Sequence, residues 1–125
     1  MTLNCGSSSV KYALFDMPDR IELCHETVEG VATGGSFLEN HELNSQKYSH
    51  YHEHLTHGTA IGLILDLLTD RKTGVLKSIS EISAVGHRVV HGGKKFTRSV
   101  IIDDKVIKEV DCLEFPASTL TGVRY

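Results

Sequence analysis

Alternating apolar and polar residues predict two strands near the start of the chain. Val10, Tyr12 and Leu14 share one face of a segment that ends at Asp16, which is the pattern of a strand with one buried face. A second alternation, over residues 21–28, predicts the next strand. The residues between the two segments include Pro and Asp, which favour a turn.

The middle of the chain changes from an irregular pattern to a helical one. Residues 30–49 follow no firm period and are interpreted as a loop with room for one short strand. Over residues 52–68 apolar side chains recur at the spacing of one helix face, at Leu55, Ile61, Ile64, Leu65 and Leu68. Gly74 follows shortly, as is common past the end of a helix.

Strand and helix alternate in the later part of the chain. Residues 80–90 begin polar and end in an apolar run that predicts a strand, and residues 99–102 predict another. Asp103 or Asp104 is suited to cap a short helix starting at Lys105, because a carboxylate accepts hydrogen bonds from free N–H groups. The order of elements indicates an α/β domain with a mixed β-sheet flanked by helices.

Composition and charge narrow the class of protein. The chain has 125 residues, 40% hydrophobic and 23% charged, as is ordinary for a soluble globular domain. Its formal net charge of -3 gives no general attraction to nucleic acid or to anionic membranes. Three cysteines without paired metal-ligand spacing favour a reducing cytoplasm. No signal peptide is visible, and the longest apolar stretch, residues 61–68, is too short to span a bilayer.

The polar run NCGSSSVK, residues 4–11, is the first candidate site. Gly6 lets the backbone turn tightly toward an anion, and the serine hydroxyls and backbone N–H groups can bind phosphate oxygens. Lys11 adds a charge suited to phosphoryl transfer. The run is not a Walker A loop, because it lacks a second Gly before the Lys and a following helix. On composition alone, the favoured alternative is a polar hairpin turn.

The run HRVVHGG, residues 87–93, is the second candidate site. In a strand, His87 and Arg88 point to opposite faces. Arg88 lies between a glycine and two β-branched residues, an unusual place for a guanidinium that binds nothing. Arginine is suited to bidentate binding of a carboxylate or phosphate. A structural ion pair explains Arg88 equally well.

A group of histidines is a third, weaker candidate. His50, His54 and His57 have the i, i+4, i+7 spacing of one helix face and so are placed to share a metal ion. Few carboxylates or thiols accompany them, and no HExxH pattern is present. A polar helix start is therefore the favoured interpretation.

Together the first two runs resemble the signatures of the acetate kinase family. Residues 4–12 are similar to its opening signature and residues 84–93 to its second one, in the right order, within a resemblance over about residues 3–110. The resemblance implies a two-domain fold of the actin, sugar-kinase and heat-shock-protein (ribonuclease-H-like) type. Each domain of that fold has a mixed β-sheet flanked by helices, and the active site lies in the cleft between them.

The resemblance also implies a role for each matching residue. Asn4 matches a position associated with Mg²⁺, Ser7 and Ser9 match hydroxyl positions near the phosphates, and Lys11 matches a position associated with ATP. Arg88 matches the position that binds the substrate carboxylate. The implied reaction is reversible phosphoryl transfer from ATP to acetate, which gives acetyl phosphate and ADP. Propionate or butyrate kinase is the close alternative, and a phosphate-binding fragment without catalysis is another.

The resemblance implies a partial protein. Residues 1–110 are expected to form an incomplete N-terminal domain, and residues 111–125 to be a divergent or foreign tail. Only three residues precede Asn4, where the family has a longer apolar strand. The family's catalytic Asp, its transition-state His and its second Arg fall beyond this chain, so no catalytic residue is assigned here. Full-length family members are expected to be cytoplasmic homodimers, and the chain alone is expected to be inactive.

Overall fold

The structure is a computed structural model that describes residues 1–34, 36–43, 46–89 and 96–112, with the backbone alone over 36–43 and 46–52. The chain divides into two compact units, and the boundary between them falls between Arg88 and Val89. Each unit is described by itself. Residues 113–125, which hold most of the predicted tail, lie outside the described residues.

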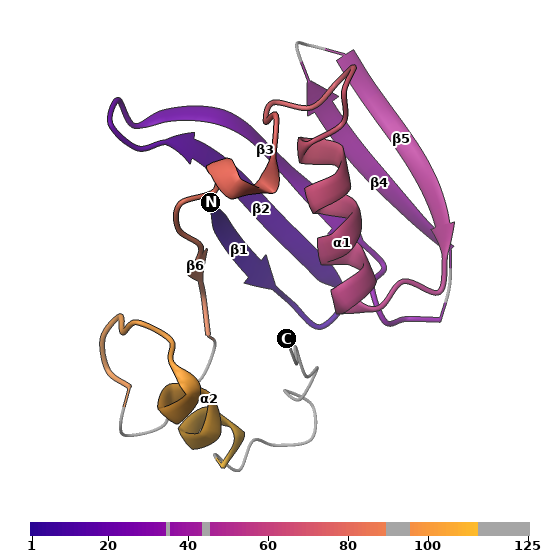
Figure 1. The fold of residues 1–125 in the computed structure, drawn as a ribbon. Helices are drawn as coiled ribbons and strands as arrows, with labels where there is room; N and C mark the ends of the chain where they lie inside the picture. The colour runs from indigo at the N-terminus through magenta and orange to yellow at the C-terminus, as the bar shows by residue number, and fades with distance from the viewer. Residues whose placement is uncertain (35, 44–45, 90–95, 113–125) are drawn as a thin grey trace. The chain divides into compact units, whose positions relative to one another are not determined.

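The first unit is built on a six-stranded sheet with the order β5-β4-β3-β2-β1-β6 (Figure 1). Its strands are β1 (Thr2–Cys5), β2 (Ser9–Asp16), β3 (Ile21–Glu29), β4 (Ser36–Leu43), β5 (Gln46–Glu53) and β6 (Gly86–His87). Successive strands from β1 to β5 pair antiparallel, whereas β6 pairs parallel to β1. The predicted mixed sheet is confirmed, and so are the two strands predicted from alternation, which are β2 and β3.

One face of the sheet is covered by helix α1 (His57–Leu68), which packs against β2 (Figure 1). The helix buries residues at the i, i+4, i+8 spacing of a single stripe, and β2 contributes alternate residues from the facing side. The buried apolar residues are Leu3, Val10, Tyr12, Leu14, Cys24, Val28, Val31, Leu55, Ala60, Ile64 and Leu68. Burial of this stripe is what fixes α1 on the sheet, because removal of apolar area from water is the main favourable term in folding.

Two predictions for the middle of the chain are wrong. Residues 30–49 contain strand β4 and the start of β5, which pair with each other along their whole lengths from Ser36↔Glu53 to Leu43↔Gln46. A ladder of this kind pairs the backbone groups by which the two strands face each other, and this does not need an apolar alternation in the sequence. The predicted helix begins at His57 and not at residue 52, because β5 runs to Glu53 and Thr56 caps α1 by accepting a hydrogen bond from the N–H of Thr59.

The later elements are shorter than predicted. Residues 79–81 form a 3₁₀ turn, η1 (Ile79–Glu81). The strand predicted at the end of the segment 80–90 is reduced, within the described residues, to β6, which pairs with β1 at Thr2↔Gly86 and Leu3↔His87. Residue 90 lies outside the described residues. Its partner β1 has four residues, so little edge is available to extend the pairing. The strand predicted over 99–102 is wrong, since these residues have no regular structure.

The described part of the second unit contains helix α2 (Asp104–Asp111). Its N-cap is Asp103, whose side chain accepts a hydrogen bond from the N–H of Val106 at 2.8 Å. The helix and its aspartate cap are therefore confirmed. No helix in the described part of the chain is long and apolar enough to cross a membrane.

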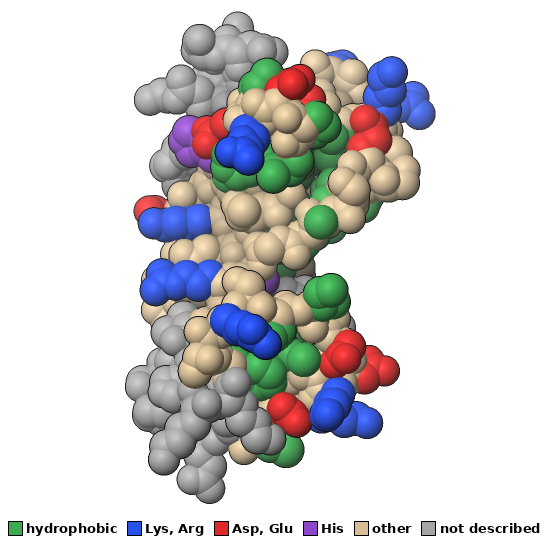
Figure 2. Space-filling model, turned by 90° about the vertical axis from the view of Figure 1, so that its left-hand side faces the viewer, with side chains coloured by type: hydrophobic (Ala, Val, Ile, Leu, Met, Phe, Trp, Pro, Cys, Tyr) green, Lys and Arg blue, Asp and Glu red, His purple; other side chains and the backbone are tan. Residues whose placement is uncertain are grey.

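Several large apolar side chains are exposed in both units, and Figure 2 shows such side chains at the surface among charged ones. Met17 and Ile21, at the hairpin between β2 and β3, are 65% and 54% exposed, and Ile101 in the second unit is 91% exposed. Apolar side chains grouped at a surface commonly mark places that contact other protein.

Candidate anion-binding site

The turn formed by residues 6–9 joins β1 to β2 and brings a serine-rich segment to one end of the sheet. The N–H of Gly6 donates to the carbonyl oxygen of Ser9 at 2.7 Å, which closes the turn. A Cβ atom at Gly6 would lie 3.2 Å from Oγ of Ser9, so glycine gives this hydroxyl its place. Ser7 and Ser8 are exposed at the tip.

Two residues from elsewhere in the unit hold the carbonyl oxygens of this turn. Nε2 of His57 lies 2.7 Å from the carbonyl oxygen of Gly6. A carbonyl oxygen only accepts, so the histidine donates its Nε2–H. The N–H of Val31 donates to the carbonyl oxygen of Ser8 at 3.0 Å. Two acceptors of the turn are therefore already occupied by protein.

The donors of the same turn are left available. Within the residues that the structure describes, the backbone N–H groups of Ser7 and Ser8 donate to no protein atom, and the three serine hydroxyls make no hydrogen bond. A turn in which the carbonyl oxygens of Gly6, Ser8 and Ser9 are occupied, while the N–H groups of Ser7 and Ser8 are free within the described residues, is suited to an anion, as in other backbone anion sites.

Asn4, Lys11 and Arg88 form a row across the face of the sheet that is opposite α1. Asn4 pairs directly with Lys11 across β1 and β2. The N–H of Arg88 donates to the carbonyl oxygen of Leu3 at 3.2 Å, which continues the parallel register of β6 and sets Arg88 beside Asn4. Neighbouring strands lie about 4.8 Å apart, so the Lys11 and Arg88 backbones are separated by roughly 10 Å.

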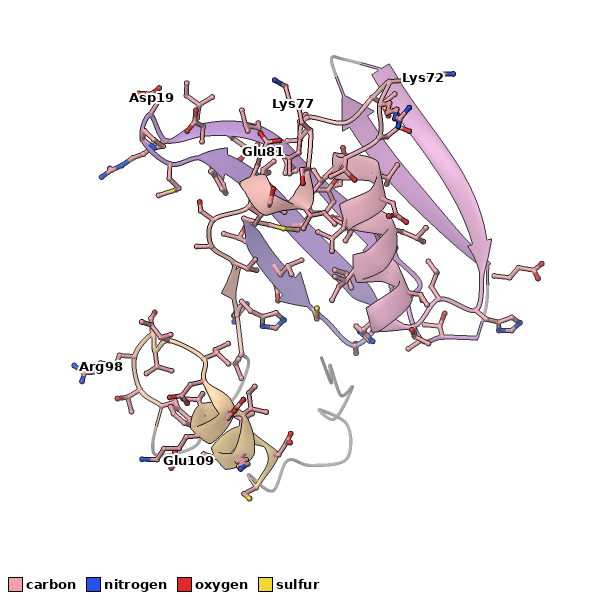
Figure 3. The ribbon with its side chains drawn as sticks, in the orientation of Figure 1. Asp19, Lys72, Lys77, Glu81, Arg98 and Glu109 are labelled. Carbon is pink, nitrogen blue, oxygen red and sulfur yellow. The ribbon has the colours of Figure 1, made fainter. Side chains whose placement is uncertain are left out.

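The row carries two cations and is accessible, and Glu29 lies opposite Ser9 on the neighbouring strand β3. Lys11 and Arg88 are exposed and Asn4 is half-buried. Among the described residues, none of these three side chains makes a hydrogen bond or an ion pair. The labelled charged side chains of this unit lie at the other end of the sheet, away from the turn (Figure 3): Asp19, Lys72, Lys77 and Glu81. The two cations of the row are therefore free to bind an anionic ligand.

Neutral groups line the opposite, core-facing side of the same strands. Burial raises the pKa of Cys5, and burial followed by the charges of Glu26 and Glu22 raises the pKa of Cys24 to about 11. Burial lowers the pKa of His87, which keeps its ring neutral at physiological pH. Nucleophilic attack by a thiolate is therefore disfavoured on this side of the sheet. The candidate ligand-binding groups are the oxygen and nitrogen donors of the other face.

The favoured interpretation of the histidines His50, His54 and His57, a polar helix start, is wrong, and so is the shared helix face on which the weaker metal-site hypothesis depended. His50 lies on β5, His54 has a positive φ of 57°, and His57 alone is on α1. No group of three or more His, Cys, Asp or Glu side chains in the described residues is placed to hold a metal ion.

Asn4 fits a limited role toward Mg²⁺. Its amide oxygen is a suitable hard ligand, has no protein partner in the described residues, and adjoins the donor-rich turn. Mg²⁺ commonly keeps several waters and takes its other ligands from substrate phosphates. One amide oxygen is consistent with that pattern, provided that a phosphate is bound nearby.

Sequence reasoning placed Asn4, Ser7, Ser9, Lys11 and Arg88 as site residues, and the fold brings all of them to one region of the first unit. It missed His57 and Val31, which hold the turn. The cap at Thr56 was detectable in the sequence as the start of α1. The contact between His57 and Gly6 spans 51 residues and leaves no local signal.

The first unit is an α/β domain with a mixed sheet, and its hairpin turn and adjoining row of cations make a candidate anion-binding site. A family model described as "Acetokinase family" matches residues 1–117. The chain belongs to the acetokinase family.

Individual relatives agree with this assignment. The chain is 51% identical over 110 residues to the acetate kinase of Geobacter metallireducens, a match over 88% of this chain and 26% of that protein. The crystal structure of Porphyromonas gingivalis acetate kinase superposes with a TM-score of 0.79 at 42% identity, over 88% of this chain and 28% of that one. A propionate kinase from Francisella tularensis gives a TM-score of 0.72 at 32% identity, over 88% and 27%. The chain thus spans little more than a quarter of the length of these relatives.

Proposed function

We propose that this chain forms part of the phosphoryl-transfer cleft of an acetate kinase. The reaction is reversible transfer of the γ-phosphoryl group of ATP to acetate, giving acetyl phosphate and ADP. The single observation that carries the proposal is the row of Arg88, Asn4 and Lys11 beside a turn with unoccupied N–H donors. In this proposal a phosphate and a carboxylate bind beside each other at Lys11 and Arg88, whose backbones lie roughly 10 Å apart.

The proposed roles follow from the chemistry of each group. Arg88 binds the acetate carboxylate through its planar pair of donors, which also orients one oxygen for attack. Lys11 and the turn with Ser7 and Ser9 bind the oxygens of the phosphoryl group that moves. The attacking carboxylate oxygen forms a bond to the γ-phosphorus while the bond to the bridging oxygen breaks, and ADP leaves with the electron pair.

Asn4 would hold Mg²⁺ through its amide oxygen, with phosphate oxygens and water completing the shell. The bound ion would supply charge neutralisation on the phosphates. Two other residues of this chain contribute in this proposal: Lys11, beside Asn4 on β2, offsets negative charge on the phosphates, and Arg88 holds the acceptor carboxylate. No residue of this chain is proposed as the catalytic base or acid.

The preferred acid is acetate in this proposal. The higher identity to the acetate kinase structure than to the propionate kinase structure, 42% against 32%, supports that choice. A propionate or butyrate kinase remains the alternative, because a single methylene changes specificity by only about 10–200-fold. A cytoplasmic location and a homodimeric full-length protein belong to the same proposal.

The proposal is tested by grafting residues 1–112 onto the remaining three quarters, roughly, of the Geobacter metallireducens acetate kinase, the relative at 51% identity. The chimera is expected to form acetyl phosphate from ATP and acetate. Lys11→Ala should lower kcat/KM for Mg·ATP by about 100-fold, since a charged hydrogen bond contributes roughly 1.5–3 kcal/mol. Lys72→Ala, at another exposed lysine, which lies away from the turn, is the matched control and should change little. A soluble, folded chimera without kinase activity would show that the chain is at most a phosphate-binding fragment.

A further inference from the structure

We propose that His57 is a positioning residue for the phosphate-binding turn. Its Nε2–H donates to the carbonyl oxygen of Gly6 and thereby fixes the direction of the Ser7 N–H, which belongs to the same planar peptide group. The inference rests on the function proposed above, which assigns the turn to a phosphoryl group. It names a residue outside that assigned set.

The geometry of His57 is that of a clamp. The side chain is 6% exposed and is the one buried polar residue in the described part of the chain. Its Nε2 lies 2.7 Å from the Gly6 oxygen, a short distance for a neutral N–H···O bond. Since the carbonyl cannot donate, the ring must carry its proton on Nε2.

The position of His57 is fixed independently of the turn. It is the first residue of α1, directly after the Thr56 cap. Ala60 and Ile64 follow on the same stripe and are completely buried. The helix therefore presents the imidazole from a rigid base, and the turn is what adjusts to it.

The consequence for the turn is electrostatic as well as steric. A free Gly6 carbonyl is an acceptor that would compete with a phosphate for the neighbouring donors and repel its oxygens. The His57 bond directs that oxygen toward α1, and the Val31 N–H does the same for the Ser8 oxygen at 3.0 Å. Two carbonyls turned to the protein leave the intervening N–H groups for the anion.

The alternative is a purely structural role, in which His57 is a buried residue that hydrogen-bonds the nearest carbonyl oxygen. That role affects the stability of the fold and acts on all substrates alike. A positioning role acts selectively on the phosphate ligand. Two observations distinguish the structural role from the positioning role. One is whether a His57 variant affects the constants for Mg·ATP more than those for acetate, and the other is whether a residue that keeps the N–H donor restores them.

The kinetic experiment uses the chimera with three variants. His57→Leu should lower kcat/KM for Mg·ATP by about 10–100-fold, as expected for a phosphate misplaced by up to an ångström, while KM for acetate stays within about twofold. His57→Gln, which places an N–H donor near the original Nε2, should recover most of the loss. Ile64→Val, a buried change on the same stripe, is the matched control for destabilisation and should leave both constants near wild type.

The proposal would be overturned if His57→Gln were as impaired as His57→Leu. It would also be overturned if His57→Leu raised KM for acetate as much as KM for Mg·ATP. The same holds if Ile64→Val reproduces the ATP-selective loss at matched stability. An inactive wild-type chimera would instead remove the function proposed above.

If the wild-type chimera is inactive, hydrogen exchange in the full 125-residue chain tests whether His57 holds the turn. The amide to follow is the Gly6 N–H, which closes the turn. This amide should exchange roughly 10-fold faster in His57→Leu than in Ile64→Val, because loss of the clamp opens the turn locally. Equal exchange in the two variants would show that His57 does not hold the turn.

Discussion

The substitution Gly6→Ala separates phosphate binding from folding. The added Cβ would lie 3.2 Å from Oγ and 3.5 Å from the carbonyl oxygen of Ser9. Gly6 does not have a positive φ, so alanine meets no backbone strain. The Ser9 hydroxyl can give by rotating, which costs about 0.5–1.5 kcal/mol for an off-rotamer side chain. The expected loss of stability is therefore small.

The expected loss of phosphate binding is larger. Ser9 Oγ is one of the proposed phosphate ligands, and a hydrogen bond to a charged group contributes about 1.5–3 kcal/mol. At about 1.4 kcal/mol per factor of ten, displacing that hydroxyl should raise KM for Mg·ATP in the chimera by roughly 10–100-fold. The free energy of unfolding of the 125-residue chain, measured in urea, should fall by less than about 1.5 kcal/mol.

Gly74→Ala is the matched control, with the opposite expected outcome. Its Cβ would lie 2.5 Å from the carbonyl oxygen of Asp70 and 2.6 Å from that residue's nitrogen. These are backbone atoms, so the chain must shift, and overpacking of this kind costs about 1–3 kcal/mol. The variant should lose stability and keep KM for Mg·ATP. An unchanged KM in Gly6→Ala, or a raised KM in Gly74→Ala at equal fraction folded, would refute the assignment of the turn.

Three further predictions concern stability and its pH dependence in the 125-residue chain. Gly62 is exposed in the middle of α1 with nothing within 4 Å of an added Cβ, so Gly62→Ala should raise the free energy of unfolding by about 0.5–1 kcal/mol. Burial lowers the pKa of His87, so the unfolded chain binds its proton more readily. Stability should then fall as pH drops below about 6.5, and His87→Leu should remove part of that slope in urea titrations between pH 7.5 and 5. The N–H groups of Lys72 and Thr73 lower the pKa of Asp70, so its stabilisation is present above the unfolded pKa and lost as pH falls through the folded one. Asp70→Asn should flatten the stability curve below about pH 4, and an unchanged acid limb would contradict this.

The elements that could be predicted are those whose buried residues recur at a regular spacing within one short segment of the sequence. Val10, Tyr12 and Leu14 alternate, and all three are buried on β2. Ile64 and Leu68 repeat at helical spacing and are buried on α1. In both elements one face is apolar because that face is buried. The spacing of the apolar residues therefore indicates whether the segment is a strand or a helix.

The part that could not be predicted depends on backbone pairing between segments. Strands β4 and β5 are held to each other by a hydrogen-bonded ladder from Ser36↔Glu53 onward. The sequence of these segments has no regular apolar alternation from which the strands could be predicted. β6 is a strand because Leu3 and Thr2 are available beside it. Pairing of this kind is a property of two distant segments, and neither segment reveals it alone.

The candidate site divides in the same way. The candidate residues at the turn and Arg88 could be recognised from the sequence, because their side-chain types are suited to binding anions. Their juxtaposition was not, because the row of Arg88, Asn4 and Lys11 exists only through the pairing of β6, β1 and β2. His57 was visible as a histidine, but its contact with Gly6 required the crossing of α1 over the sheet.

The most direct test of the central claim is the effect of Arg88→Ala on acetate phosphorylation by the chimera, with acetyl phosphate trapped as its hydroxamate. Arg98→Ala, an exposed arginine in the second unit, is the matched control. The account predicts that Arg88→Ala lowers kcat/KM for acetate by about 100-fold, the equivalent of roughly 3 kcal/mol for a lost bidentate charged contact, while Arg98→Ala changes it little. An active chimera in which Arg88→Ala is folded and turns over acetate as well as Arg98→Ala does would contradict the proposed cleft.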